Sequence, residues 1–141
     1  MQPLTVPGTR ESLEAVARFV QEASGEAGLA RKAGYRLRQA VDELATNAIV
    51  HGYERSGQEG RLYLSAEIGD GQLSIVVEDT GPPFDPTAIA RPESLDRPPE
   101  ERQVGGLGIF LALRNVDDFA YARVAGRNRS TLTIKLPPAA A

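Results

Sequence analysis

The chain has 141 residues, of which 41% are hydrophobic and 25% charged, and this composition predicts a single globular domain, residues 1–141, with its own core. The net charge of −3 and the lack of a Lys/Arg stripe argue against a nucleic-acid partner; zero cysteines and a single histidine exclude disulfides, thiolate zinc sites, cysteine nucleophiles and histidine-rich metal clusters. The N-terminus has no apolar signal core and no stretch reaches the roughly 20 apolar residues that span a bilayer, so we expect a cytoplasmic protein with no membrane partner.

The first predicted elements are a short strand and a helix. Residues 4–6 fit an edge strand, and Thr9 is placed to cap the helix that follows. The core face of this helix consists of apolar residues at helical spacing, namely Leu13, Val16, Ala17 and Val20. We expect the helix to end near Gly25 or Gly28, because glycine is common at helix ends.

A second helix is predicted over residues 29–51, ending at Gly52, where helix termination commonly needs positive φ. Its core face is apolar and consists of Leu37, Val41, Leu44 and Ala48. Glu43 and Asn47 form an i,i+4 pair on the flank of that face. A half-shielded carboxylate and carboxamide suit the positioning of a hydroxyl or water and the binding of a hydrated Mg²⁺. The alternative is the ordinary polar border of an amphipathic helix.

A β-hairpin with one buried face is predicted next. Apolar residues alternate with polar ones on both sides of a Gly-Asp-Gly turn at 69–71, and they are Leu62, Leu64, Ala66, Ile68, Leu73, Ile75 and Val77. Asp79 keeps the same parity, so its carboxylate is aimed at the apolar side at the strand's end, where a charge needs a partner. Gly81 allows the backbone or a ligand to approach Asp79 closely. The alternative role for Asp79 is to cap the turn.

Hydrophobic periodicity vanishes over residues 82–104, which hold six of the ten prolines, and so long an irregular segment indicates a lid, a binding loop or disorder. The sequence Gly-Gly-Leu-Gly at 105–108 then leads into an apolar helix that begins at Ile109. Its N-terminal amides, exposed by small residues, suit an anion such as a phosphate. The alternative is a flexible hinge that ends the loop.

Two further strands are predicted at residues 119–124 and 131–136, joined by a turn at 126–130, Gly-Arg-Asn-Arg-Ser. The fold class is therefore α+β: a two-layer sandwich with a mostly antiparallel sheet and three helices packed on one face. The polar groups of the second helix, of the strand end at Asp79 and of the glycine-rich helix start are expected to meet on the same side of that sheet.

These motifs, in this order, resemble the ATP-binding domains of the GHKL superfamily (the Bergerat fold). The segments DELATNAIVHGY, DTGPPFDP and GGLGIFLALRNVDDFAY are similar to the anti-sigma-factor serine/threonine kinases of the RsbW and SpoIIAB type. The resemblance implies bound ATP or ADP with Mg²⁺, Glu43 as general base, and Asn47 as the Mg²⁺ ligand. It also implies that adenine and the phosphates are held by Asp79, Gly81, Gly105, Gly106, Leu107, Gly108 and Thr131. Arg102 would reach the γ-phosphate, or else be a solvated lid charge.

The resemblance implies an anti-sigma factor that phosphorylates a serine of a STAS-type antagonist and binds a sigma factor as a homodimer. The alternative is a nucleotide-sensing binding module with little or no kinase activity. His51 falls within the matched motif, and we interpret it as a residue that satisfies the helix end or packs the turn, not as a phosphoacceptor.

Overall fold

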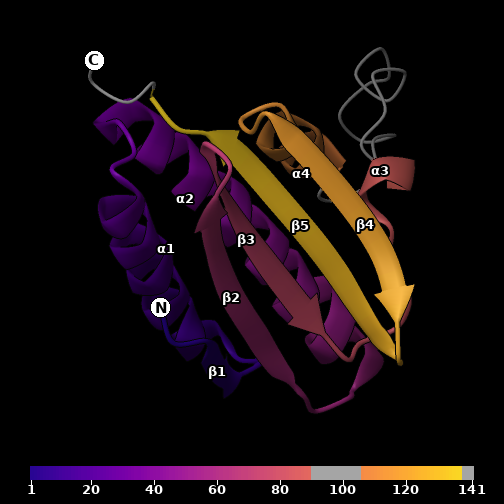
Figure 1. Ribbon diagram of the computed structural model, residues 1–141. Helices are drawn as coiled ribbons and strands as arrows, with labels where there is room; N and C mark the ends of the chain where they lie inside the picture. Colours follow the sequence, from indigo (N-terminus) through magenta and orange to yellow (C-terminus); the bar gives the residue numbers. More distant parts are fainter. Residues whose placement is uncertain (90–105, 138–141) are drawn as a thin grey trace.

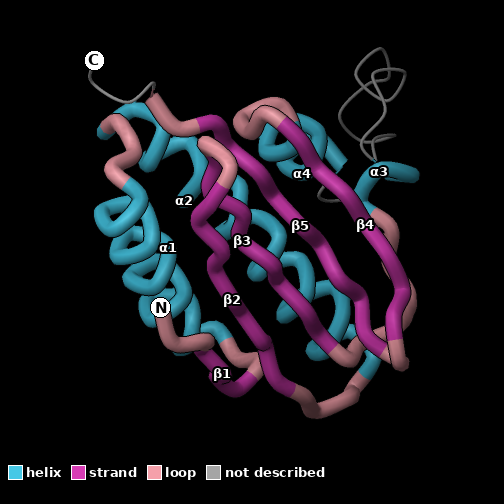
Figure 2. The backbone as a smooth tube through the Cα atoms, viewed as in Figure 1, coloured by secondary structure: helices cyan, strands magenta, loops and turns pink. Residues whose placement is uncertain are grey.

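The computed structural model describes residues 1–89 and 106–137. A five-stranded antiparallel sheet in the order β1-β2-β3-β5-β4 forms one layer, and α1, α2 and α4 lie on one side of it (Figures 1 and 2). The strands are β1 (Leu4–Pro7), β2 (Arg61–Gly69), β3 (Gln72–Asp79), β4 (Asp118–Val124) and β5 (Arg127–Lys135). The helices are α1 (Leu13–Ala27), α2 (Arg31–Asn47), α3 (Pro86–Ile89) and α4 (Gly106–Leu113). This two-layer α+β architecture confirms the predicted fold class.

The first helix ends at a glycine, as predicted, but it does not start as predicted. Gly28 adopts φ +71° and its N–H bonds back to the last turn of α1. Thr9 precedes a 3₁₀ turn, Arg10–Ser12, and its side chain makes no capping hydrogen bond. The prediction of a Thr9 side-chain cap is therefore wrong, because the tighter 3₁₀ turn starts the helix instead.

The second helix does not stop at Gly52. Helix α2 continues through a π-helical segment, Ala48–Glu54, and the two form one helical rod, residues 31–56. The rod ends at a turn at Gly57, which adopts φ +75°. Gly57, and not Gly52, supplies the left-handed backbone that ends the helix. Such π-helical turns occur frequently at functional sites. The longer rod places His51 within the helix, so its interpretation as a helix-end residue is wrong.

The two hairpin turns differ in how well the sequence predicts them. The β2–β3 turn falls at Asp70 and Gly71, with φ +54° and +73°, as the Gly-Asp-Gly signal predicts. The β4–β5 turn uses Ala125 and Gly126, with φ +50° and +77°, so β5 begins at Arg127. The prediction of a turn over residues 126–130 is wrong, and those polar residues belong to a strand.

Strand alternation divides the sheet into a face covered by helices and an uncovered face. The buried residues between the layers include Leu62, Leu64, Leu73, Ile75, Val77, Leu132 and Ile134 from the strands and Val20, Leu37, Val41 and Ile49 from the helical layer. Full burial of one such side chain contributes roughly 1.5–3 kcal/mol. No helix of the part that the structure describes is both long enough and apolar enough to span a membrane.

Candidate functional site

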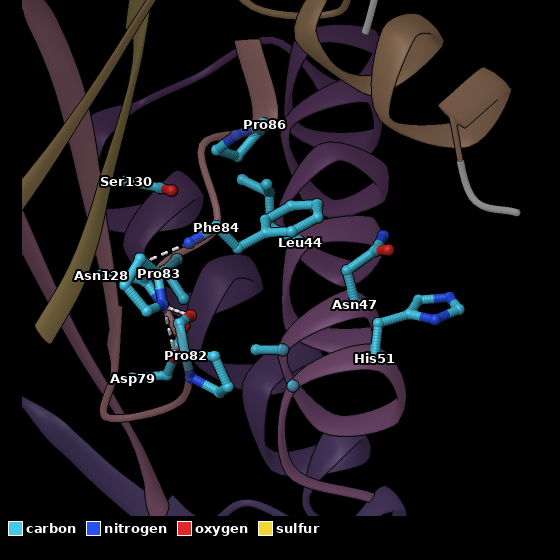
Figure 3. Close-up of a pocket in the computed structure, with 13 residues that line it drawn as sticks. Leu44, Asn47, His51, Asp79, Pro82, Pro83, Phe84, Pro86, Asn128 and Ser130 are labelled. Carbon is cyan, nitrogen blue, oxygen red and sulfur yellow. Dashed lines mark hydrogen bonds between the residues drawn. The ribbon is translucent and has the colours of Figure 1, made fainter. Parts of the chain in front are cut away.

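A pocket lies between the helical rod and the ends of β3 and β5, and its cavity measures about 140 Å³. Figure 3 shows Asp79 and Asn128 on the strand side, and Asn47 and His51 on the helix side. The lining residues are Leu44, Asn47, Ala48, His51, Gly52, Val77, Asp79, Pro82, Pro83, Phe84, Pro86, Asn128 and Ser130. The pocket therefore joins two of the motifs that the sequence predicts to meet.

Asp79 is the last residue of β3, and its side chain lies on the covered face, as its parity predicts. Its Oδ1 accepts hydrogen bonds from Gly81 N–H (2.9 Å) and from Asn128 Nδ2 (3.0 Å). Asp79 thus caps the turn, and its Oδ2 accepts no hydrogen bond from the described residues. Gly81 packs so closely that an added Cβ would lie 3.0 Å from Asp79 Oδ1. The strand end therefore offers one carboxylate oxygen to a hydrogen-bond donor in the pocket.

Asn128 is a site residue that sequence reasoning missed. It is 6% exposed, its Nδ2 also donates to Pro82 O (2.8 Å), and its Oδ1 accepts from Phe84 N–H (3.0 Å) and Tyr121 Oη–H (2.6 Å). The sequence predicts a turn over residues 126–130, and a residue in a turn has no predictable side-chain direction. The usable signal is its parity with Leu132, because residues two apart on a strand share a face.

Asn47 and Glu43 occupy successive turns of α2. Asn47 is 7% exposed, and its Nδ2 donates to Glu43 O (2.8 Å) and, at a longer 3.4 Å, to Glu43 Oε1. These bonds direct the amide nitrogen toward the helix and leave Oδ1 as an acceptor. A carboxamide oxygen suits Mg²⁺, which commonly keeps several waters and takes only one or two protein ligands beside phosphate oxygens. No group of three His, Cys, Asp or Glu residues within 1–89 and 106–137 forms a metal cluster.

Helix α4 packs against α2 at the position of Glu43. A Cβ placed on Gly108 would collide with the Glu43 carboxylate, so the glycine is needed for this close approach. The structure thus brings Gly108 and Glu43 together, and Gly106 begins α4. Gly105, Arg102 and most of the predicted lid lie outside the described residues, as does the side chain of Leu107.

The structure does not bring Thr131 to the pocket. Thr131 pairs with Val76 and Ala120 and has the opposite parity to the buried Leu132, so its side chain lies on the uncovered face. Ser130 lines the pocket in its place. The structure therefore does not place the Thr131 side chain at the pocket, because adjacent residues of a strand face opposite sides.

Together, the sandwich fold and the pocket between a strand-end aspartate and a helix-borne asparagine define a class of ATPase-like domain. The sequence profile described as the histidine kinase-like ATPase domain matches residues 6–135, and the chain belongs to this family.

Curated relatives carry two kinds of name. The chain is 32% identical over 90 residues to the serine-protein kinase RsbW of Staphylococcus epidermidis, which covers 62% of this chain and 57% of that protein. It is 31% identical over 117 residues to RsbW of Halalkalibacterium halodurans, covering 77% and 67%. It is 32% identical over 84 residues to the anti-sigma F factor of Bacillus licheniformis, covering 60% and 56%. The match thus spans little more than half of two of these relatives.

Solved structures of other proteins share the fold. The RsbU and RsbW domains of Rv1364c from Mycobacterium tuberculosis match with TM-score 0.62 and 21% identity, over 96% of this chain and 33% of that one. The SiaB-SiaC complex from Pseudomonas aeruginosa matches with TM-score 0.64 and 14% identity, over 95% and 89%. At these identities the likeness concerns the fold alone.

Proposed function

We propose that the chain is an ATP-dependent serine kinase and anti-sigma factor that phosphorylates a serine of an antagonist protein. The observation that carries the proposal is the order of polar groups along the site: Asp79 at the strand end, Asn47 on the facing helix, and Glu43 one turn further, beside Gly108 of α4. This order matches the parts of a nucleotide from base to terminal phosphate. The names of the relatives support the kinase and anti-sigma activities.

Each residue has a role in this proposal. Asp79 Oδ2 accepts a hydrogen bond from the amino group of adenine, and Gly81 leaves room beside the base. The cavity of about 140 Å³ is smaller than the roughly 300–1,000 Å³ of pockets for drug-sized ligands. It therefore suits the base, with the phosphates extending along α2 toward α4.

The remaining residues act at the phosphates. Asn47 Oδ1 contributes one ligand to Mg²⁺, which when bound neutralises charge on the transferring phosphoryl group. The amides at the start of α4, from Gly106 to Gly108 with Gly105 before them, hold the phosphate oxygens. Glu43 accepts the proton of the attacking serine hydroxyl. Phosphoryl transfer depends mostly on such positioning and charge stabilisation, so few groups are needed.

The second candidate function is nucleotide sensing with little or no transfer. It is favoured by the contact between Glu43 and Gly108, because a carboxylate packed against α4 is partly shielded from an incoming serine. In that case the chain binds its partners according to the nucleotide it holds. In both cases we propose a cytoplasmic homodimer with a sigma factor and a STAS-type antagonist as partners.

The test is phosphate transfer from Mg·ATP to a candidate STAS-type antagonist, followed by mass spectrometry. We expect one phosphoserine with the wild type, and a rate at least about 10²-fold lower with Glu43→Ala, the usual scale for loss of a general base. The Asp42→Ala variant is the matched control, because the neighbouring exposed carboxylate should not matter. ATP binding without transfer in the wild type would favour nucleotide sensing.

A further inference from the structure

The carboxamide of Asn128 is fully used. A carboxamide offers two N–H donors and two acceptor lone pairs, and the Nδ2 of Asn128 donates to Asp79 Oδ1 and Pro82 O. Its Oδ1 accepts from Phe84 N–H and the Tyr121 hydroxyl. With four partners and 6% exposure, the amide has one orientation, since a flip would place like groups together at Asp79 Oδ1, Pro82 O and Phe84 N–H.

This orientation fixes how Asp79 meets the pocket. Asp79 Oδ1 receives two donors, Asn128 Nδ2 and Gly81 N–H. The carboxylate cannot rotate without losing both bonds, so Oδ2 keeps one direction. An ionised carboxylate only accepts hydrogen bonds. A base with an amino group facing Asp79 Oδ2 donates a hydrogen bond to it. A base with a carbonyl at the same position places one acceptor oxygen against another.

The same amide holds the chain that closes the strand side of the pocket. Asn128 binds both Pro82 O and Phe84 N–H, so its hold spans the short segment that leads to α3. Figure 3 shows Phe84 directed across the pocket toward Leu44 of α2. Arg123 adds a separate bond from its guanidinium to Gly81 O (2.8 Å). One side chain of β5 thus positions the carboxylate and the apolar wall together.

We propose that Asn128 is the positioning residue that makes the pocket select a 6-aminopurine over a 6-oxopurine. It acts through Asp79, by holding Oδ2 toward the base, and through Pro82 and Phe84, by holding the wall against the ring. The inference rests on the proposed function only in that a purine nucleotide binds here. It adds a determinant of base selectivity that lies outside the motifs of the helix and the strand end.

The experiment compares the affinities of Mg·ATP and Mg·ITP, which differ at position 6 of the purine, by calorimetry. The wild type should bind ATP about 10-fold or more tightly than ITP, since a polar site left unpaired is costly. Asn128→Leu removes both Nδ2 donors at similar side-chain volume and adds no second carboxylate beside Asp79 Oδ1. The substitution should lower the affinity for ATP about 10-fold and the affinity for ITP much less, so that the ratio of the two affinities approaches one.

Two further variants separate selectivity from folding. Tyr121→Phe removes a partner of Asn128 Oδ1 but leaves both Nδ2 bonds, so the ATP-to-ITP ratio should stay at the wild-type value. Asn128→Ala provides a second measurement if Asn128→Leu does not fold, and it should also lower the ATP-to-ITP ratio. A purely structural role would weaken both nucleotides equally, and an unchanged ratio in the folded Asn128 variants overturns the inference. Binding of neither nucleotide by the wild type would instead overturn the proposed function.

Discussion

Tyr53 is expected to support the backbone beside the nucleotide site, and Tyr53→Phe should measure how much its hydroxyl contributes to the stability of the protein. Its ring is 3% exposed, and an added Cβ on either Gly8 or Gly60 would overlap it. The Tyr53 hydroxyl donates to Arg61 O (2.7 Å) and accepts from Thr80 N–H (2.8 Å). Phenylalanine keeps the ring but leaves both backbone groups without this partner.

Loss of these two bonds should lower the free energy of unfolding by about 1–3 kcal/mol, at about 0.5–1.5 kcal/mol for each hydrogen bond. Urea denaturation gives this value from the shift in midpoint at constant slope. Because Thr80 lies between Asp79 and Gly81, the stabilisation by Mg·ATP should also fall. Tyr63→Phe is the control, since its hydroxyl makes no hydrogen bond within the described residues and its ring lies under Arg127. Equal effects of the two substitutions would refute the reasoning.

Three other outcomes are expected. Gly108→Ala should push the Glu43 carboxylate away from α4 and slow phosphate transfer by roughly 10-fold or more, and an unchanged transfer rate would contradict a role for this contact. Chelation of Mg²⁺ should weaken ATP binding to the wild type but have little further effect on Asn47→Ala, and equal sensitivity of both would remove Asn47 as a ligand. Protease cleavage within residues 82–104 should slow when Mg·ATP is added, and an unchanged cleavage rate would argue against a nucleotide-responsive lid.

The features predicted well are those set by local periodicity. The alternation of apolar residues predicts the β2–β3 hairpin, because residues two apart on a strand share a face, and the buried ones are Leu62, Leu64, Leu73, Ile75 and Val77. The parity of Asp79 follows from the same alternation, which is why its direction is also predicted. The helical spacing of Glu43 and Asn47 places both on one flank of α2 for a similar reason.

The features predicted poorly depend on backbone conformations for which the sequence carries no clear local signal. Gly52 and Gly57 both suit a helix end, and of the two only Gly57 adopts positive φ, at +75°. The β4–β5 turn requires positive φ at Ala125, which is uncommon for a residue with a Cβ. A turn over residues 126–130 leaves Asn128 without a defined face, whereas the expected role of Thr131 rests on the family resemblance and not on the position of the turn.

The central claim, that the pocket at Asp79 binds the base of ATP, is tested most directly by calorimetric titration of Mg·ATP into the wild type and Asp79→Asn. The account predicts saturable binding by the wild type and affinity at least about 10-fold lower for the variant, since the amide loses the charge and places a donor where an acceptor is needed. Glu43→Ala should bind ATP as the wild type does. No binding by the wild type at millimolar ATP, or equal binding by Asp79→Asn, would contradict the account.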